Sequence, residues 1–551
     1  MVLDQTNSAD VLIAPAPGPG ALRHRLEEAI LGDIASGRLA PGTALPPSRT
    51  LADALGISRW VITEAYGHLV GKGVLEARTG SATRVAAVAP APPAAAGAGR
   101  RPVPAARLER APDRATHDLA PGVPDLRHVP RDAWLRAARE ALADATNQDL
   151  GAQPPAGHPA ARAAVATHLR RSRIVTGPDD AVVLTRGAAD GMSRIAAALA
   201  AAGHTHLLVE DPSWAALRDV AAAAGLTPVP VPVDDDGISP ALLRAAAART
   251  GARAALLTPA HQFPLGAALP DERRAALLDW AREVDGLLIE DDYDAEFRYD
   301  RRPVPALQGL DPGRVLLLGS TSKTLAPAFG IGWMVVPQRW RAPVLDVSVR
   351  RGPAPGPATL DQLTLARFVG DGAYARYLRA ARTRYGRRRA ALLAALEREL
   401  PGARIGGIAA GMHVTVDLAG VRVGPGGAGA AGVDGVAGVD GAAGVDPVDD
   451  AAAVDPAAVD PAAVDAAAVD AAVVVDAAAV VREGAARDIA LVDLRRYQAA
   501  PAARSTVLVV GYGNLADARL PAAIRGLRAA VEAASAGVAS VEAASAGAAA
   551  S

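Results

Sequence analysis

The stretch RVLLLGSTSK, residues 314–323, places a lysine directly after a run of apolar residues. A short apolar run that ends in polar residues is typical of a buried strand that opens onto a loop. The 551-residue chain has 58 lysines and arginines, of which only Lys72 and Lys323 are lysine. Chemistry that needs a primary amine on a side chain therefore has two candidates, and Lys323 stands at the end of a predicted strand.

Similar apolar runs occur on either side of this stretch, and helical patterns rich in alanine separate several of them. The predicted strands are residues 181–187, 206–212, 252–259, 286–292 and 314–320. The predicted helices are residues 188–202, 213–224 and 271–283. Strands that alternate with helices form βαβ units, so we expect an α/β domain with a mainly parallel sheet.

The composition excludes several classes of protein. The absence of cysteine rules out disulfides, thiolate metal sites and cysteine nucleophiles. The first residues, MVLDQTNSAD, lack the basic and then apolar pattern of a signal peptide. No uncharged run reaches the roughly 18 apolar residues that a membrane-spanning helix needs. We therefore expect a soluble, cytoplasmic protein with no membrane partner.

The N-terminal part of the chain, residues 21–85, predicts a small α+β unit that binds DNA. Apolar residues recur at helical spacing, Gly56 stands in a turn, and Ser58 is suited to cap the helix that follows. A helix, a turn with glycine and a second helix form a helix-turn-helix, and residues 75–85 predict a hairpin after it.

The second helix of such a motif enters the major groove of DNA with its N-terminus first. That geometry makes the candidate DNA-binding residues Arg49, Ser58, Arg59, Thr63, Arg78 and Gly80. Arginine pairs with guanine or holds a phosphate. For any single arginine, a solvated surface position is the alternative interpretation.

Composition also marks the boundaries between segments. Residues 424–480 contain ten aspartates and no lysine or arginine, with Val-Asp recurring every five or six residues. Such a stretch is typical of disorder, and a repetitive solenoid is the less favoured alternative. We expect a disordered N-terminus (1–20), the DNA-binding unit (21–85), a Pro/Ala-rich linker (86–115), the α/β domain (116–423 and 481–533), the acidic insertion (424–480) and a disordered tail (534–551).

The surroundings of Lys323 indicate a pyridoxal phosphate site. A lysine in this position is suited to form a Schiff base with an aldehyde cofactor, and Ser320 and Ser322 offer donors to a phosphate. A pyridoxal ring also needs a carboxylate at its nitrogen and a donor to its phenolic oxygen. Asp291 and Tyr293 lie at the end of the strand at 286–292, where alternation points both to one face and Asp292 to the other. A metal site built from these carboxylates is the alternative, but it lacks a nearby histidine.

Two further loops support this interpretation. Gly187, Ala188 and Ala189 join a predicted strand to a helix, where backbone N–H groups bind phosphate. Trp214 stands at the start of the next helix, where an indole stacks on a ring. A buried core tryptophan is the alternative for Trp214.

These motifs closely resemble a known family. PGTALPPSRTLADALGISR (41–59) resembles the winged helix-turn-helix of GntR regulators, although Ala82 replaces a glycine that is usual in the wing. VEDPSW, TPAHQFPLG, IEDDYDAEFRY and STSKTLAP are similar to signatures of the MocR subfamily, in which this unit is fused to a fold-type I aminotransferase-like domain.

The resemblance assigns further roles. It implies Lys323 as the cofactor lysine, Asp291 as the partner of the pyridine nitrogen and Tyr293 as the partner of the phenolic oxygen. It also implies Trp214 as the stacking ring and His261 as part of a loop that lines the cofactor. Gly330 replaces the arginine that usually clamps the phosphate, and Arg504 is the candidate for binding an effector carboxylate.

The resulting hypothesis is a transcriptional regulator that uses pyridoxal phosphate to sense a small amine, an amino acid or a B6 vitamer. Its expected partners are a double-stranded DNA operator and a second copy of the chain in a head-to-tail homodimer. An active aminotransferase with an accessory DNA-binding domain is the first alternative. A domain that no longer binds the cofactor and only dimerises is the second.

Overall fold

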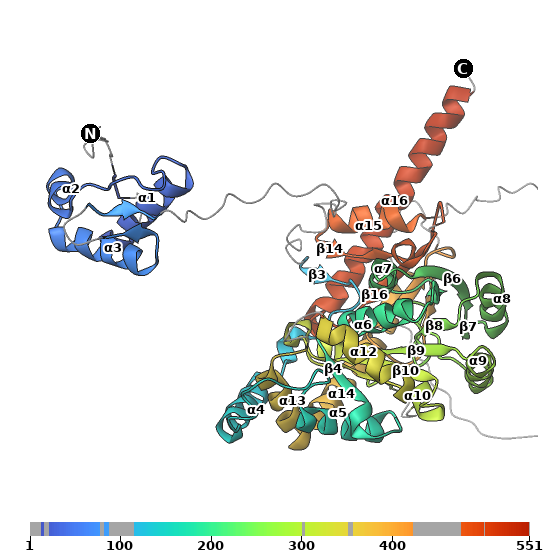
Figure 1. The fold of residues 1–551 in the computed structure, drawn as a ribbon. Helices are drawn as coiled ribbons and strands as arrows, with labels where there is room; N and C mark the ends of the chain where they lie inside the picture. Colours follow the sequence, from blue (N-terminus) through green and yellow to red (C-terminus); the bar gives the residue numbers. More distant parts are fainter. Residues whose placement is uncertain are drawn as a thin grey trace, which may run out of the picture. The chain divides into compact units, whose positions relative to one another are not determined.

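The computed structural model describes residues 13–15, 21–77, 82–86, 115–299, 304–350, 356–421, 475–500 and 502–549 (Figure 1). The chain divides into two compact units, Met1–Arg110 and Ala111–Ser551. Arg78, Gly80, almost all of the predicted linker and residues 422–474 of the acidic insertion lie outside the described residues. Within the described residues, no helix combines the length and apolar character needed to cross a membrane.

The N-terminal unit is a winged helix-turn-helix, as its pattern predicts. Its elements are α1 (Leu22–Ala35), α2 (Ser48–Leu55), α3 (Arg59–Gly71) and the antiparallel strands β1 (Leu75–Glu76) and β2 (Arg84–Val85). Gly56 ends α2 with a φ of +64°, a conformation that favours glycine. The Ser58 hydroxyl then caps α3 by accepting a hydrogen bond from the backbone N–H of Trp60 at 3.3 Å. The turn that orients α3 therefore follows from two local residues.

The second unit is built on an eight-stranded sheet with the order β4-β11-β10-β9-β8-β5-β6-β7. The strands β5, β6, β8, β9 and β10 run parallel, whereas β11 lies antiparallel to both β10 and β4, and β7 is antiparallel to β6. Their bounds are β4 (Val182–Thr185), β5 (His206–Asp211), β6 (Thr227–Asp234), β7 (Gly237–Ile238), β8 (Ala254–Leu257), β9 (Leu287–Asp292), β10 (Val315–Ser320) and β11 (Gly332–Val335). The prediction of a mainly parallel sheet is confirmed.

Helices cover both faces of this sheet (Figure 1). Along β10, Leu316 and Leu318 pack in one apolar cluster with α6, α7 and α12, whereas Leu317 packs in another with α5 and α13. Buried residues on both faces of a strand are expected for parallel sheets. The helices of this layer are α4 (Arg131–Asp144), α5 (Pro159–Ser172), α6 (Ala188–Ala201), α7 (Ala215–Ala223), α8 (Pro240–Thr250), α9 (Asp271–Glu283), α10 (Leu307–Leu310), α11 (Thr321–Thr324), α12 (Gln338–Arg350) and α13 (Thr359–Gly370).

A smaller C-terminal subdomain has its own antiparallel sheet, in the order β12-β13-β16-β15. Its helices and strands are α14 (Ala373–Glu399), β12 (Arg404–Gly406), β13 (His413–Asp417), α15 (Ala477–Ala485), β14 (Ile489–Ala490), β15 (Val492–Asp493), β16 (Val507–Gly511) and α16 (Leu520–Ala549). The short strand β3 (His117–Asp118) pairs in parallel with β14, so the beginning of the second unit is anchored to its C-terminal part.

Three predicted boundaries of disorder are wrong. Ile13, inside the predicted disordered N-terminus, is buried in the core of the N-terminal unit. Val475 and Val480, inside the predicted insertion, are buried in the C-terminal subdomain, because α15 begins directly after Asp476. Residues 534–549 continue α16 instead of forming a disordered tail. Alanine and glutamate favour helix strongly, and low sequence complexity does not oppose that preference.

Candidate functional site

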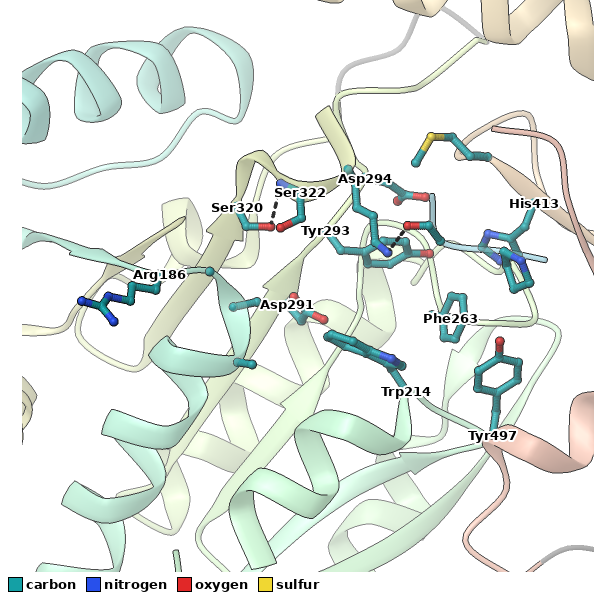
Figure 2. A pocket seen from close by; sticks show the side chains of 17 residues that line it. Arg186, Trp214, Phe263, Asp291, Tyr293, Asp294, Ser320, Ser322, His413 and Tyr497 are labelled. Carbon is teal, nitrogen blue, oxygen red and sulfur yellow. Dashed lines mark hydrogen bonds between the residues drawn. The ribbon is translucent and has the colours of Figure 1, made fainter. Parts of the chain in front are cut away.

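A cavity of about 220 Å³ opens at the carboxyl ends of β9 and β10 (Figure 2). Ends of parallel strands gather residues from separate parts of the chain at one edge of the sheet, which is where α/β proteins bind ligands. The cavity is lined by residues from the loop after β3, the starts of α6 and α7, the ends of β9 and β10, and the small subdomain. Most of the predicted cofactor residues line it: Gly187, Ala188, Ala189, Trp214, Asp291, Tyr293, Ser320, Ser322 and Lys323.

Lys323 extends into the cavity from the short helix α11. Its Nζ atom donates a hydrogen bond to the carbonyl oxygen of Gly122 and lies 5.9 Å from the centroid of the Trp214 ring. A Cβ atom at position 122 would lie 2.9 Å from Nζ, and the φ of Gly122 is +103°, so glycine leaves room for the amine. Burial lowers the pKa of Lys323, against the opposing effect of Asp294 and Asp291. A lowered pKa favours the neutral amine that acts as a nucleophile.

The end of β9 places two adjacent carboxylates in opposite environments. Asp291 is buried and faces the cavity, and its Oδ1 atom has no hydrogen-bond partner. Burial raises the pKa of Asp291 to about 7, and repulsion from Asp292 adds to the rise. Asp292 points the other way and accepts a hydrogen bond from Nε of Arg173 at 2.7 Å. The predicted alternation of these side chains is confirmed.

Tyr293 lies beside a buried histidine–aspartate pair. The Nδ1 atom of His261 lies 2.9 Å from Oδ2 of Asp294 and 3.0 Å from the hydroxyl of Tyr293. Burial and the charge of Asp294 raise the pKa of Tyr293 well above its usual value, so this hydroxyl remains a hydrogen-bond donor. His261 itself is not part of the cavity lining, whereas Phe263 of the same loop is, and His261 contacts Tyr293 and Asp294, which both line the cavity. Its effect on the cavity passes through these two residues.

His413 lies near this pair. Ligand atoms of His261, Asp294 and His413 lie within 4.8 Å of one another, which is a geometry that a metal ion could use. Each residue already has a hydrogen-bond partner: His261 contacts Asp294, and Nε2 of His413 contacts the carbonyl oxygen of Pro264 at 3.1 Å. We interpret them as a hydrogen-bonded His261–Asp294 pair with the His413 ring packed beside it, its centroid 5.1 Å from that of His261.

The opposite end of the cavity is built from neutral groups. Gly187, with a φ of +118°, leads into α6. Its backbone lies so close to Gly332 that a Cβ atom at position 332 would be 2.6 Å from the Cα atom of Gly187. The hydroxyls of Ser320 and Ser322 line the same end. Together, a helix N-terminus and two hydroxyls make a neutral cradle for an anion.

No guanidinium group completes this cradle among the residues that line it. Arg186 is the only arginine in the described lining, and its side chain points away from the cavity (Figure 2). Its Nε donates a hydrogen bond to the carbonyl oxygen of Gly356 at 3.0 Å. Gly330, where the family resemblance expects an arginine, ends a short 3-10 helix with a φ of +58°. This end of the cavity, where the motif predicts a phosphate, therefore carries less positive charge than the motif predicts.

Four residues that the sequence did not single out close the other side of the cavity: Phe263, Met412, His413 and Tyr497. The ring of Phe263 packs edge-on against Tyr293, His413 and Tyr497, with centroids 5.8, 5.1 and 4.9 Å apart. Burial and the proximity of His261 lower the pKa of His413 well below its usual value, so its imidazole is neutral at neutral pH. Arg504, the predicted effector-binding residue, is exposed and does not line the cavity.

In the N-terminal unit, Arg49, Ser58, Arg59 and Thr63 all lie on the exposed surface around the start of α3. Nε of Arg59 lies 3.4 Å from the hydroxyl of Ser48, which connects the two helices of the motif. The structure thus brings together the described members of the predicted DNA-binding set. Arg78 and Gly80 stay outside the described residues.

Comparison with known proteins identifies both units. Residues 22–85 match the family described as bacterial regulatory proteins, gntR family, and residues 117–428 match aminotransferase class I and II. The chain is 33% identical over 393 residues to the probable rhizopine catabolism regulatory protein MocR of Rhizobium meliloti, covering 69% of this chain and 78% of the relative. It is also 33% identical over 411 residues to the HTH-type pyridoxine biosynthesis transcriptional regulator PdxR of Corynebacterium glutamicum, covering 74% of this chain and 86% of the relative.

Solved structures support the fold of the second unit. The multiple substrate aminotransferase of Thermococcus profundus superposes with a TM-score of 0.60 at 20% identity, covering 78% of this chain and 94% of that protein. The kynurenine aminotransferase of Pyrococcus horikoshii gives a TM-score of 0.59 at 20% identity, covering 75% of this chain and 90% of that protein. Taken together with the curated relatives, these matches show that the chain belongs to the MocR subfamily of GntR-family transcriptional regulators, which join a winged helix-turn-helix to an aminotransferase-like domain.

Proposed function

We propose that this regulator binds pyridoxal phosphate in the cavity around Lys323 and uses it to sense a small amine, an amino acid or a B6 vitamer. The aminotransferase class I and II fold family depends on this cofactor. The observation that carries the proposal is the unpartnered Oδ1 atom of Asp291, which is buried in the same cavity as the Lys323 amine. A buried carboxylate without a partner is costly, so a ligand with a matching N–H group is the expected complement.

The other residues of the cavity fit the remaining parts of the cofactor. Asp291 would hold the pyridine nitrogen, Tyr293 the phenolic oxygen and the Trp214 indole one face of the ring. The phosphate would lie at the N-terminus of α6, near the hydroxyls of Ser320 and Ser322. The bound cofactor supplies an aldehyde that reacts reversibly with primary amines. Lys323 would hold the cofactor covalently and compete with an incoming amine for that aldehyde.

We further propose that the winged helix-turn-helix binds a double-stranded operator in the cytoplasm. GntR-type regulators bind DNA operators, and α3 exposes the residues expected to reach the groove. A head-to-tail homodimer would present two such heads to two half-sites. The effector would act by binding more tightly to one arrangement of the dimer than to the other, because only differential affinity shifts such an equilibrium.

An absorbance titration tests the cofactor site. We expect the full-length protein, after addition of pyridoxal phosphate, to develop a visible absorbance band that borohydride reduction fixes to a single lysine. Peptide mapping should identify that lysine as Lys323. A protein that develops no band at saturating cofactor would overturn the cofactor-dependent part of the proposal and leave the DNA-binding part standing.

A working aminotransferase is the second candidate, because Lys323, Asp291 and Tyr293 all lie in one cavity. The two candidates differ in turnover. Multiple turnovers with an amino acid and a keto acid would favour the enzyme. Effector-dependent changes in operator affinity without multiple turnovers would favour the sensor.

A further inference from the structure

Trp60, the second residue of the recognition helix α3, has the largest exposed fraction among the large apolar side chains of the described residues, at 66%. Burying a large aromatic side chain is strongly favourable, so an indole left in water is a candidate contact for a partner. Trp60 is not among the residues that the sequence predicts to bind DNA, although its neighbours Ser58 and Arg59 are.

The helix presents Trp60 on the face opposite its core. Ile62, Ala65, Tyr66 and Leu69 of α3 are buried in the N-terminal unit. The exposed positions 60, 63, 64 and 67 follow the spacing of a single helical stripe on the other side. This outward stripe is the part of the helix that a groove of DNA would meet.

Besides the exposed carboxylate of Glu64, the stripe presents apolar groups. The hydroxyl of Thr63 donates to the carbonyl oxygen of Arg59 at 3.0 Å, so its methyl group is the part left for a partner. Gly67 adds no side chain to the stripe, although glycine is less favourable than alanine within a helix. No atom lies within 4 Å of where its Cβ would be, so the fold does not require glycine there, and its absence of a side chain permits close approach of a partner.

The surroundings favour DNA as that partner. Arg49 and Arg59 are exposed at the same end of α3, so the apolar groups lie beside positive charge. The major groove offers one apolar group, the C5-methyl of thymine, and contacts to it from threonine methyl and aromatic side chains are a recognised mode of base readout.

We propose that Trp60 and the methyl group of Thr63 read the C5-methyl group of thymine in each operator half-site. This inference rests on the proposed DNA binding and goes beyond it by naming the base and the atoms that are recognised. Arg49 and Arg59 contact the DNA phosphates or guanine, whereas the side chains of Trp60 and Thr63 distinguish thymine from the other bases.

The experiment measures the methyl contact directly. Operator duplexes are first selected from a randomised library with the full-length protein. Each thymine of the selected half-site is then replaced by deoxyuridine, which removes only the methyl group. Transfer of one buried methyl or methylene group is worth about 0.8 kcal/mol, so we expect one or two of these replacements to weaken wild-type binding about three- to fivefold.

Variants of the protein test the same methyl contact from the protein side. Trp60→Ala should weaken binding to the thymine operator and lose sensitivity to deoxyuridine at the same position. Thr63→Ser, which removes the methyl group, should reduce that sensitivity, whereas Thr63→Val, which keeps methyl groups and removes the hydroxyl, should preserve it. Leu242→Ala, at an exposed leucine of α8 in the other unit, is the matched control and should change nothing.

The outcomes separate this inference from the proposed function. Wild-type binding that ignores every deoxyuridine replacement, or a Trp60→Ala protein that keeps the wild-type sensitivity, would overturn the inference and leave DNA binding intact. Failure of the library to yield any preferred duplex would overturn both. Because the side chain of Trp60 is largely exposed, the variant should keep the thermal unfolding temperature of the wild type, and that measurement accompanies each affinity.

Discussion

The two ends of the cavity around Lys323 differ in charge. At the ring end, the Lys323 amine lies close to Asp291 and Asp294, and burial shifts the pKa values of Lys323 and Asp291 towards their neutral forms. At the phosphate end, the lining consists of backbone N–H groups and the hydroxyls of Ser320 and Ser322. Arg–phosphate pairs are among the strong hydrogen bonds of proteins, and none is provided by the described lining. Under the proposed function, a cofactor in this cavity would be held mainly by its ring and aldehyde, with a weaker hold on its phosphate.

The largest expected effect comes from removing the amine. Lys323→Ala should abolish the visible absorbance band and the covalent retention of the cofactor after gel filtration. Lys72→Ala is a natural control, because it removes the only other lysine of the chain and should leave the band unchanged. A band that survives in Lys323→Ala would show that the ring end does not hold the cofactor as described.

Asp291→Asn tests the carboxylate at the ring end. Removing one partner of a buried charge pair costs about 3–5 kcal/mol, so we expect cofactor affinity to fall at least a hundredfold in fluorescence titrations. Asp292→Asn is the matched comparison, since the neighbouring carboxylate pairs with Arg173 outside the cavity. That variant should lower the thermal stability of the protein without a comparable loss of affinity per folded molecule.

Asp291→Asn, which should weaken cofactor binding, should in contrast increase the stability of the cofactor-free protein. The pKa of Asp291 is raised to about 7 by burial, above its value in the unfolded chain, so the carboxyl group destabilises the fold as pH rises from about 4 to 7. Asp291→Asn removes this loss and should stabilise the cofactor-free protein at pH 8 by about 2–4 kcal/mol. The gain should shrink as the pH falls towards 4. Equal gains at pH 8 and pH 4, measured by denaturant unfolding, would contradict the assignment.

The ring end could be predicted from the sequence because its geometry is local. Alternation along β9 orients Asp291 and Tyr293 to one face, and Lys323 follows β10 by three residues. The other side of the cavity could not be predicted, because His413 and Tyr497 come from a subdomain whose docking depends on tertiary packing. His261 carries the right motif and contacts Tyr293, and Phe263 of the same loop lines the cavity. Arg504 was chosen for its position near a predicted strand, and its side chain is exposed in the structure.

The predicted boundaries between ordered and disordered segments were wrong for a different reason. Repetition in residues 424–480 concealed a change of pattern at Asp476, where the Val-Asp repeat gives way to a helix that buries Ala477 and Val480. In the C-terminal part, Leu527, Ala530 and Val531 continue the buried stripe of α16 towards residue 534. Helical periodicity was present in both stretches, and composition alone outweighed it in the prediction.

Gly330→Arg tests the phosphate end by adding the missing charge. A single charge-assisted hydrogen bond contributes about 1.5–3 kcal/mol, so we expect cofactor binding to tighten about ten- to a hundredfold, with stronger competition by inorganic phosphate. The positive φ of Gly330 adds a backbone cost of about 1–2 kcal/mol to folding with or without the cofactor, so the variant should also be less stable. Gly330→Ala carries the backbone cost without the guanidinium group and should give no tightening. Equal affinities for the two variants would mean that position 330 does not face the phosphate.

Ser322→Ala should have the smallest effect. The Ser320 hydroxyl accepts a hydrogen bond from the backbone N–H of Ser322 and caps α11, so Ser320→Ala would disturb the helix that carries Lys323. Ser322→Ala leaves this cap in place and removes only a hydroxyl from the cradle, which is worth about 0.5–1.5 kcal/mol. We expect a two- to tenfold loss of cofactor affinity in the wild-type background. In Gly330→Arg the loss should be smaller, because the guanidinium group would bind the same phosphate group. An equal loss in the two backgrounds would place the two groups on separate parts of the cofactor, because independent contacts contribute additively.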